Sequence, residues 1–312
     1  MKEKAGPIIV IGSLNVDIVA RLSRIPAPGE TLFCQTYRMV AGGKGANQAA
    51  AVARLGGRAM MVGKVGQDFF GRFLIEKLNQ AGVDTRFVRR ERKSPTGLAL
   101  IWVNQIGENS IVVVGGANQT LTEKEIDCLQ PFIKRAAIVL LQLEIPLKTV
   151  CHTIRLANKF SVPVVLDPGP ASPLPPGIFP LISFILPNEP EAGMLVGAKI
   201  TGIQAARKAA RILLEKGVKK AAIIKLGKKG CLLASREMFV HIPALSVKAV
   251  DTTAAGDIFA GAFAIALVEG QDYLSAVRLA TVAAGISVTR EGAQPSIPNR
   301  TEVEELRKRL WP

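Results

Sequence analysis

Histidine and cysteine are scarce in this chain of 312 residues, and their scarcity excludes several kinds of site. The two histidines, His152 and His241, cannot build a His-rich zinc site, and a Ser-His-Asp triad would have to use one of them. The four cysteines lie far apart and form no CxxC pair. This spacing predicts free or buried thiols in a reducing compartment.

Acidic and aromatic residues are also few. The chain holds 25 Asp and Glu against 40 Lys and Arg, a formal net charge of +15 that attracts anions. With only 12 Phe, 2 Trp and 2 Tyr, the stacking platforms that single-stranded nucleic acid needs are not supported. We therefore favour a basic solvated surface with no nucleic-acid partner. Small phosphate-bearing substrates fit the charge equally well.

Long apolar runs are missing as well. The longest, Ile258–Val268, is too short to span a bilayer. The apolar stretch Ile8–Ile11 is cut short by Gly12 and Asn15, which predicts that there is no secretory signal. These features predict a soluble, cytoplasmic protein with no membrane partner.

What the chain does contain is a regular alternation of short apolar runs and helical patterns, within a composition that is 48% hydrophobic. Such alternation is typical of an α/β fold, a doubly wound and mostly parallel sheet with helices on both faces. The predicted strands are Ile8–Ile11, Met60–Val62, Ile138–Leu143, Val162–Leu166, Phe184–Leu186, Ala221–Ile224 and Cys231–Ala234. The predicted helices are Ala46–Leu55, Phe69–Gln80, Glu123–Lys134, Leu147–Asn158, Ala205–Glu215, Ile258–Val268 and Leu274–Val288.

Three extended segments interrupt this alternation with no helix between them. They are Thr31–Val40, Gly97–Val103 and Ser110–Val114, the last two flanking a predicted turn at 104–109. Since they cannot easily join a βαβ sheet, we predict a small antiparallel subdomain built from about residues 17–40 and 97–115. No linker or repeat is evident, so the prediction is a single domain spanning residues 1–312.

Polar clusters follow five of the predicted strands. In open α/β sheets, ligands bind at the carboxyl ends of the strands, so these clusters predict a site along one edge. The clusters are Gly12–Asp17, Gln142–Glu144, Asp167–Gly169, Pro187–Glu189 and Lys225–Gly230.

The strongest chemical signal is the segment Asp251–Asp257, which reads DTTAAGD and runs directly into an apolar helix. Small residues before a helix leave backbone N–H groups free to bind an anion. Asp257 can then accept a hydroxyl proton while those N–H groups hold the charge of a transferring phosphoryl group. The alternative is that Asp257 is only an N-cap, but a cap requires neither the small residues nor a second acid at Asp251.

A second signal is the glycine-rich segment Ala41–Ala49, which reads AGGKGANQA. Its glycines allow close approach of the backbone to a ligand, and Lys44 and Asn47 offer hydrogen-bond donors. The chain has no GxxxxGK[ST] P-loop. Taken alone, the segment is also compatible with a generic glycine-rich turn before a helix.

Together, these two segments resemble the signatures of the ribokinase-like (PfkB) family of carbohydrate kinases. The resemblance covers nearly the whole chain. It includes Gly12–Asp17, Pro28–Thr31, Gln142–Glu144, Pro187–Glu189 and Val288–Ser296. The segment Gly42–Gln48 and the terminal motif Gly-Ala-Gln-Pro-Ser narrow it to the members that act on ribose.

The resemblance implies ATP-dependent phosphorylation of D-ribose at its 5-hydroxyl, giving D-ribose 5-phosphate and ADP. Asp257 would be the base, and the backbone N–H groups of Ala254, Ala255 and Gly256 would form an anion hole. The residues implied to hold the sugar are Ser13, Asn15, Asp17, Gly42, Gly43, Lys44, Asn47, Glu144 and Asp257.

The resemblance also implies sites for ATP, Mg²⁺ and K⁺. The implied nucleotide-binding residues are Asn188, Lys225, Gly227, Gly230, Gly256 and Thr281. Asn188 and Glu191 would handle magnesium indirectly, although both also suit the start of a helix, Asn188 as its cap and Glu191 through the helix dipole. The implied ligands of the monovalent cation are Asp251, Thr253, Ser287, Arg290, Gly292 and Ser296.

Four positions depart from the family pattern, and alternatives remain open. Lys225 stands where Thr is usual, and Asp167 where Asn is common. Ala255 replaces a frequent Gly, and Ile258 a usual Thr. The alternative activities are those of a 2-deoxyribose, fructose or nucleoside kinase, or a non-catalytic sugar- or nucleotide-binding protein. By the same resemblance, the partners are a sugar and ATP. The small antiparallel subdomain would be a lid over the sugar and would pair two subunits into a homodimer.

Overall fold

The computed structural model describes residues 6–34, 36–104 and 109–311, and its main sheet confirms the predicted parallel α/β architecture. The order of the strands across this sheet is β13-β12-β11-β10-β9-β8-β1-β4-β5. All neighbours from β11 to β5 run parallel, whereas β12 and β13 add an antiparallel edge. The strands are β1 (Ile8–Ile11), β4 (Ala59–Gly66), β5 (Asp84–Glu91), β8 (Ile138–Leu141), β9 (Val164–Leu166), β10 (Phe184–Ile185), β11 (Ala221–Lys225), β12 (Cys231–Ser235) and β13 (Phe239–Ile242).

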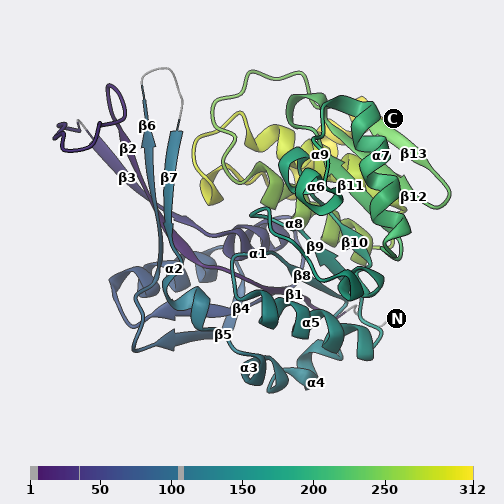
Figure 1. The fold of residues 1–312 in the computed structure, drawn as a ribbon, viewed down its shortest axis with the longest axis horizontal. Coiled ribbons are helices and arrows are strands. Elements are labelled where there is room, and N and C mark those ends of the chain that lie inside the picture. Colours follow the sequence, from purple (N-terminus) through teal and green to yellow (C-terminus); the bar gives the residue numbers. More distant parts are fainter. Residues whose placement is uncertain (1–5, 35, 105–108, 312) are drawn as a thin grey trace.

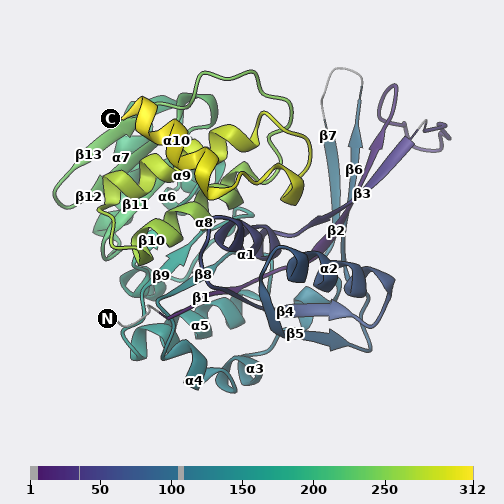
Figure 2. The ribbon, with the colours of Figure 1, turned by 180° about the vertical axis from the view of Figure 1, so that it is seen from behind.

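Helices cover both faces of this sheet, as Figure 1 and the reverse view in Figure 2 show. One hydrophobic core joins the sheet to α1 (Lys44–Arg54), α2 (Phe69–Gln80), α8 (Ala255–Val268), α9 (Tyr273–Ser287) and α10 (Arg300–Leu310). A second core on the opposite face includes α3 (Glu123–Asp127), α4 (Gln130–Ile133), α5 (Leu147–Lys159), α6 (Glu189–Val196) and α7 (Gly202–Glu215). Because both faces are covered, the central strands are buried along their whole length, which explains their continuous apolar runs.

The boundaries differ from the sequence prediction at several places. The helix expected over Glu123–Lys134 is two short helices, α3 and α4, and the second begins with Pro131 in its first turn, where a proline is tolerated. The apolar helix expected from Ile258 begins three residues earlier, at Ala255. Strands β2, β5 and β13 and helix α10 were not predicted, and of α6 only the start at Asn188 was expected.

A second sheet stands beside the main one, to the left in Figure 1. Its order is β3-β2-β6-β7, from β2 (Asn15–Arg21), β3 (Thr36–Gly42), β6 (Gly97–Val103) and β7 (Asn109–Val114). The two outer pairs are antiparallel, as expected, and the central strands β2 and β6 run parallel. The turn expected between β6 and β7 falls at positions 105–108, outside the described residues. Only three residues separate the end of β1 from the start of β2, so the base of this sheet adjoins the carboxyl edge of the main sheet.

In the described part of the chain, no helix is both long and apolar enough to cross a membrane.

Candidate active site

The polar residues predicted at the strand ends meet at one edge of the main sheet, around Asp257. This carboxylate lies in the first turn of α8 and is 4% exposed. Asn47 donates from Nδ2 to Oδ2 at 3.0 Å, and Lys44 donates from Nζ to Oδ1 at 3.4 Å. The glycine-rich segment and the DTTAAGD segment therefore form a single site, although 210 positions separate Asn47 from Asp257.

The start of α8 leaves space for an anion. Its N-cap is Ala254, not Asp257, and no side chain of the described residues caps the helix there. Ala254 adopts a left-handed backbone with φ of 60°, and the Ala255 N–H reaches the Thr252 carbonyl at 3.3 Å. Because Ala255 and Gly256 have small side chains, the positive end of the helix is accessible to a ligand.

Four of the predicted sugar-binding residues form a polar cluster at the end of β1. Glu144 accepts hydrogen bonds from the Ser13 hydroxyl and from the Lys44 backbone N–H, the latter at 3.1 Å. Burial raises the pKa of Glu144. Asn15 is held by Asn118, whose Nδ2 donates to Asn15 Oδ1 at 2.8 Å.

Asp17 lies near this cluster and carries a strongly shifted pKa. Burial raises its pKa to about 7, and the charges of Glu144 and Asp257 add to the shift. Gly42 is required beside it, because a Cβ on Gly42 would lie 2.2 Å from Asp17 Oδ2. Gly43 likewise has φ of 88° and leaves no room for a Cβ, which would lie 2.6 Å from the Asn15 nitrogen.

Lys44 is the cation nearest to Asp257 in this site. Burial alone would lower its pKa, but the carboxylates of Asp257, Asp167 and Glu144 outweigh burial and raise it well above the usual value. Lys44 therefore stays charged beside the base and close to Asp167, 3.8 Å away.

A cavity of about 560 Å³ extends from Asp257 along the start of α8. It is lined by all six predicted nucleotide-binding residues, Asn188, Lys225, Gly227, Gly230, Gly256 and Thr281. Apolar residues that were not predicted line it as well, among them Leu245, Val247, Ala249, Ala284 and Val288. Their positions in a loop and on α9 carry no local motif, so the sequence offered no signal for them.

Asn188 and Glu191 form the start of α6. Asn188 is the N-cap, and the two residues make a reciprocal capping box in which the Asn188 N–H donates to Glu191 at 2.8 Å. Glu191 is 5% exposed, and burial raises its pKa. The capping role expected from the sequence is confirmed by this geometry.

Three of the residues predicted to bind a monovalent cation, Asp251, Thr253 and Gly292, are joined by hydrogen bonds. Asp251 accepts hydrogen bonds from the Thr253 N–H and the Gly292 N–H, each at 2.9 Å. The Ser287 and Ser296 hydroxyls instead donate to carbonyls three residues earlier, and Arg290 pairs with Glu302. Within the described residues, no group of three or more His, Cys, Asp or Glu side chains is placed to hold a metal ion.

Three residues that contact the predicted site residues were not themselves predicted, namely Gln48, Asn118 and Asp167. Gln48 Nε2 lies 3.4 Å from Asp257 Oδ1 and 3.2 Å from Asp167 Oδ2. Lys225 Nζ lies 2.7 Å from Asp167 Oδ1. Asp167 and Gln48 lie within segments that the sequence had singled out, whereas Asn118 lies in a short 3-10 turn without any motif.

Comparison with known proteins shows which proteins this chain is similar to. A sequence model of pfkB family carbohydrate kinases matches residues 7–300. A ribokinase of Haemophilus influenzae is 41% identical over 96% of this chain and 97% of its own length. A deoxyribokinase of Salmonella typhi is 38% identical over the same shares, 96% and 97%. A solved structure of Arabidopsis thaliana ribokinase with ribose and ATP superimposes with a TM-score of 0.92 at 37% identity, covering 97% of this chain and 99% of that one.

Proposed function

The chain belongs to the pfkB family of carbohydrate kinases, and on that premise we propose that it phosphorylates D-ribose at the 5-hydroxyl with ATP, giving D-ribose 5-phosphate and ADP. The observation that carries this proposal is the position of Asp257. It lies between the polar cluster of Ser13, Asn15 and Glu144 and the cavity that runs along α8. The similarity to ribokinases over nearly the whole chain supports ribose as the sugar.

The chemistry follows from two features of this chain. Asp257 takes the proton of the sugar hydroxyl, whose oxygen forms a bond to the terminal phosphorus of ATP while the bond to the bridging oxygen breaks and ADP leaves. The N–H groups of Ala254 and Gly256 at the start of α8, and that of Ala255 once it leaves the Thr252 carbonyl, hold the charge on the phosphoryl oxygens during transfer. Lys44 Nζ, 3.4 Å from Asp257 Oδ1, holds this carboxylate in position until a hydroxyl is bound.

The sugar is held by residues that can pair with neutral hydroxyls. Asn47 is 4% exposed, and its Oδ1 has no hydrogen-bond partner among the described residues, so it is available to a sugar hydroxyl. Asn15, Asp17, Glu144 and the backbone at Gly42 and Gly43 complete the set. A neutral polyol suits these groups because it can donate to the carboxylates and accept from the amides.

Magnesium and potassium would each have a defined place. The Glu191 carboxylate already accepts from the Asn188 N–H, so this pair suits a magnesium ion that reaches the site with ATP through water. Asp251 and nearby carbonyls suit a large, weakly hydrated cation such as potassium beside the anion hole. The hydrogen bonds from Thr253 and Gly292 outweigh burial and lower the pKa of Asp251, so this carboxylate is charged.

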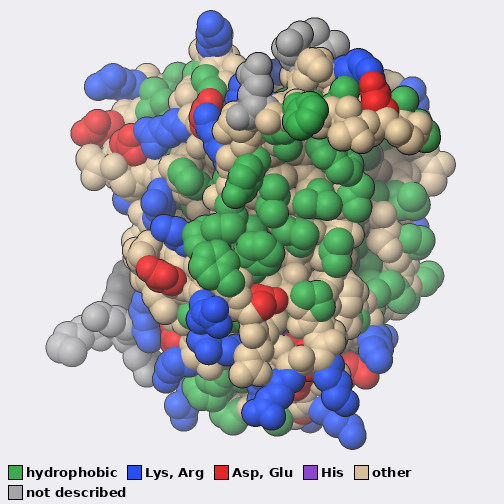
Figure 3. All heavy atoms as spheres, turned by 90° about the vertical axis from the view of Figure 1, so that its left-hand side faces the viewer, with side chains coloured by type: hydrophobic (Ala, Val, Ile, Leu, Met, Phe, Trp, Pro, Cys, Tyr) green, Lys and Arg blue, Asp and Glu red, His purple; other side chains and the backbone are tan. Residues whose placement is uncertain are grey.

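The second sheet would act as a lid over the sugar and as the dimer interface. Register places Met39, Ile18, Leu100 and Val112 in one row across the four strands, on the face opposite Asp17. Tyr37 and Val112 on that face are 70% and 47% exposed. Figure 3 shows hydrophobic side chains gathered on this side of the molecule. A second copy of the chain would bury such a surface, which monomers rarely expose.

A second candidate function is phosphorylation of 2-deoxyribose, because deoxyribokinases are 38% identical to this chain. A coupled assay of ADP formation across ribose, 2-deoxyribose, fructose and a nucleoside, with and without potassium, separates the candidates. The proposal expects the highest kcat/KM with ribose, and a higher value with 2-deoxyribose would replace it. The use of ATP and the four free cysteines support a cytoplasmic location.

A further inference from the structure

The described residues contain a completely buried carboxylate, Asp167, which lies behind the proposed base and follows the end of β9. Its side chain is 0% exposed and is contacted by three donors. Lys225 Nζ lies at 2.7 Å, Gln48 Nε2 at 3.2 Å and Lys44 Nζ at 3.8 Å. A carboxyl group removed from water in this way is costly to bury unless charged and hydrogen-bonding partners surround it.

Lys225 links this buried carboxylate to the cavity. It is the last residue of β11, and its backbone N–H donates to the Pro187 carbonyl at 2.8 Å, which fixes the start of the side chain. A Cβ built on Gly256 would lie 3.3 Å from Lys225 Nζ, so the ammonium group lies against the first turn of α8. Lys225 and Gly256 both line the cavity of about 560 Å³.

We propose that Lys225 is a catalytic residue that binds the transferring phosphoryl group from the side of Gly256, and that Asp167 is the positioning residue that holds its ammonium there. This proposal rests on the proposed kinase function. A lysine ammonium has three donor protons, and Asp167 occupies one, so two remain for phosphoryl oxygens. ATP carries this terminal phosphoryl group and ADP lacks it, so Lys225 makes the site prefer ATP.

The same carboxylate connects this ammonium to the base. Gln48 Nε2 bridges Asp167 and Asp257, with distances of 3.2 and 3.4 Å, and Lys44 lies between the same two carboxylates. Asp167 thus sets the relative positions of the group that removes the proton and the group that receives the phosphoryl charge. An ion pair that only stabilised the fold would not require its cation to line the cavity beside the anion hole, as Lys225 does.

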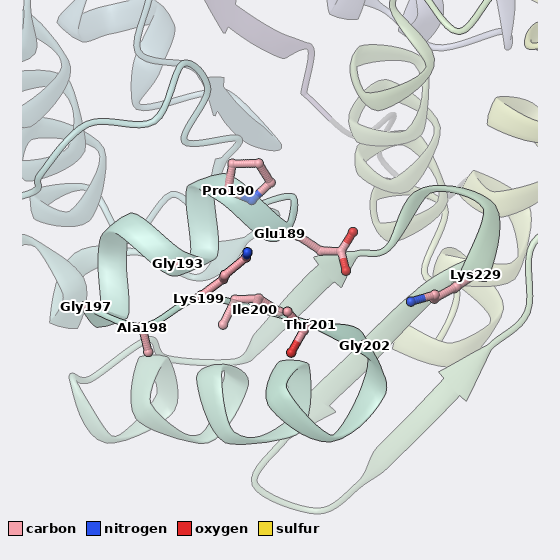
Figure 4. A pocket seen from close by; sticks show the side chains of 10 residues that line it. All are labelled: Glu189, Pro190, Gly193, Gly197, Ala198, Lys199, Ile200, Thr201, Gly202 and Lys229. Carbon is pink, nitrogen blue, oxygen red and sulfur yellow. The ribbon is translucent and has the colours of Figure 1, made fainter.

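The decisive experiment compares binding of the non-hydrolysable ATP analogue AMP-PNP with binding of ADP, by calorimetry in magnesium and without sugar. Lys225→Met is expected to weaken AMP-PNP binding by at least about tenfold, the loss typical of a hydrogen bond to a charged group, and to change ADP binding by less than about twofold. The control is Lys199→Met, a lysine in the loop between α6 and α7 and outside the predicted clusters. Figure 4 shows Lys199 beside a second pocket between these helices, and substitution of its exposed side chain should leave both affinities unchanged.

Asp167→Asn tests the positioning role. It should reduce the preference for AMP-PNP over ADP and lower kcat while leaving the KM for ribose nearly unchanged. In the double variant with Lys225→Met, the loss should be no larger than that of Lys225→Met alone, because Asp167 acts through Lys225. Additive losses, or equal weakening of AMP-PNP and ADP by Lys225→Met, would overturn the proposal.

These outcomes are separable from failure of the proposed function. If the unmodified protein fails to phosphorylate any sugar, the kinase assignment is wrong, whereas the binding comparison requires no sugar and no turnover. If Asp167→Asn does not fold, Lys225→Met alone decides the matter, since Asp167 keeps Gln48 and Lys44 as partners in that variant. An unchanged AMP-PNP preference in that variant contradicts the proposal.

Discussion

The Asp251 carboxylate accepts a hydrogen bond from the Gly292 backbone N–H at 2.9 Å, and this contact joins two loops that are 41 positions apart. One loop leads into α8 and the other follows α9, so the contact holds the start of α8 against the end of its neighbour. The same carboxylate accepts from the Thr253 N–H. Anything that binds between these loops will therefore affect the shape of the proposed anion hole.

Potassium is expected to raise the rate several-fold over sodium when ionic strength is held constant. A large cation beside Asp251 would fix the two loops and the N–H groups of α8 without touching either substrate. Asp251→Ala should abolish the difference between the two salts. Constant ionic strength matters because a chain of net charge +15 responds to salt through screening in general.

The control for this measurement is Asp272→Ala. Asp272 is also a loop carboxylate that accepts from a nearby N–H, that of Ser275, but it caps α9 at the opposite end. This variant should keep the response to potassium. Equal rates in potassium and sodium for the unmodified protein would leave Asp251 as a residue that braces the loops and would remove the cation from the mechanism.

Asp257→Asn should fold normally and lose turnover by a factor of about 10² to 10⁴, because the amide cannot take the hydroxyl proton. Its oxygen can still accept one hydrogen bond from Asn47 or Lys44, so the site should keep its shape. The measurement is kcat for ribose together with a thermal unfolding curve. Ribose phosphorylation at a near-normal rate would place the base elsewhere.

Asn15→Ala and Glu144→Ala should each weaken ribose binding by roughly 1–3 kcal/mol, since each leaves partner groups unpaired in a buried site. Glu144 would release the Ser13 hydroxyl and the Lys44 N–H, and Asn15 would release Asn118. ATP affinity measured without sugar should barely change. If ATP binding falls equally, these side chains support the fold and do not select the sugar.

Asp17→Asn should stabilise the unliganded protein, and more so at pH 8 than at pH 5. The pKa of Asp17 is raised by burial to about 7 in the folded chain, above the ordinary value of 3.8 in the unfolded chain. The folded state therefore binds the proton more tightly and loses stability as pH rises from about 4 to about 7. The increase in the free energy of unfolding that the substitution causes, measured by urea unfolding, should be roughly 2 kcal/mol larger at pH 8 than at pH 5.

Asp68→Asn should change the stability with the opposite dependence on pH. Burial acts to raise the pKa of Asp68, but hydrogen bonds from Thr96 and Gly71 outweigh it and lower the pKa. This substitution should destabilise the protein more at neutral pH than in acid, where the carboxyl is protonated. If Asp17→Asn and Asp68→Asn show the same pH trend, Asp17 is not held in its protonated form near neutrality.

Val112→Lys should convert a dimer to a monomer, measured by light scattering after size exclusion. Val112 lies on the apolar face of the second sheet and is 47% exposed, so a lysine there is tolerated in a monomer but disfavoured when that face is buried. Met194→Lys is the control, because Met194 is 52% exposed on α6, away from that sheet. A monomeric unmodified protein, or a Val112→Lys dimer of unchanged affinity, would exclude this face as the interface.

The core of the fold could be predicted because its information is local. Buried parallel strands such as β1 and β8 are continuous apolar runs, and α2 was predicted over its full length from its periodicity. Strand β5 was missed because it lies at the edge of the sheet and reads DTRFVRRE, with five charged residues that hide any alternation. Only the start of helix α6, at Asn188, was expected, because the helix contains Pro190 and Gly193 and is only eight residues long.

For the site, the sequence by itself determined which chemical groups are present and in which short segments they lie. Two short segments carry these groups: the glycine-rich segment, and the small residues that lead to Asp257. Because each segment spans only a few neighbouring positions, its pattern can be recognised in the sequence alone. Only the tertiary structure decided their partners. Lys225 and Asp167 are 58 positions apart, and they pair because β11 and β9 end at the same edge of the sheet with β10 between them. A contact of that kind depends on strand order and register, which no short segment specifies.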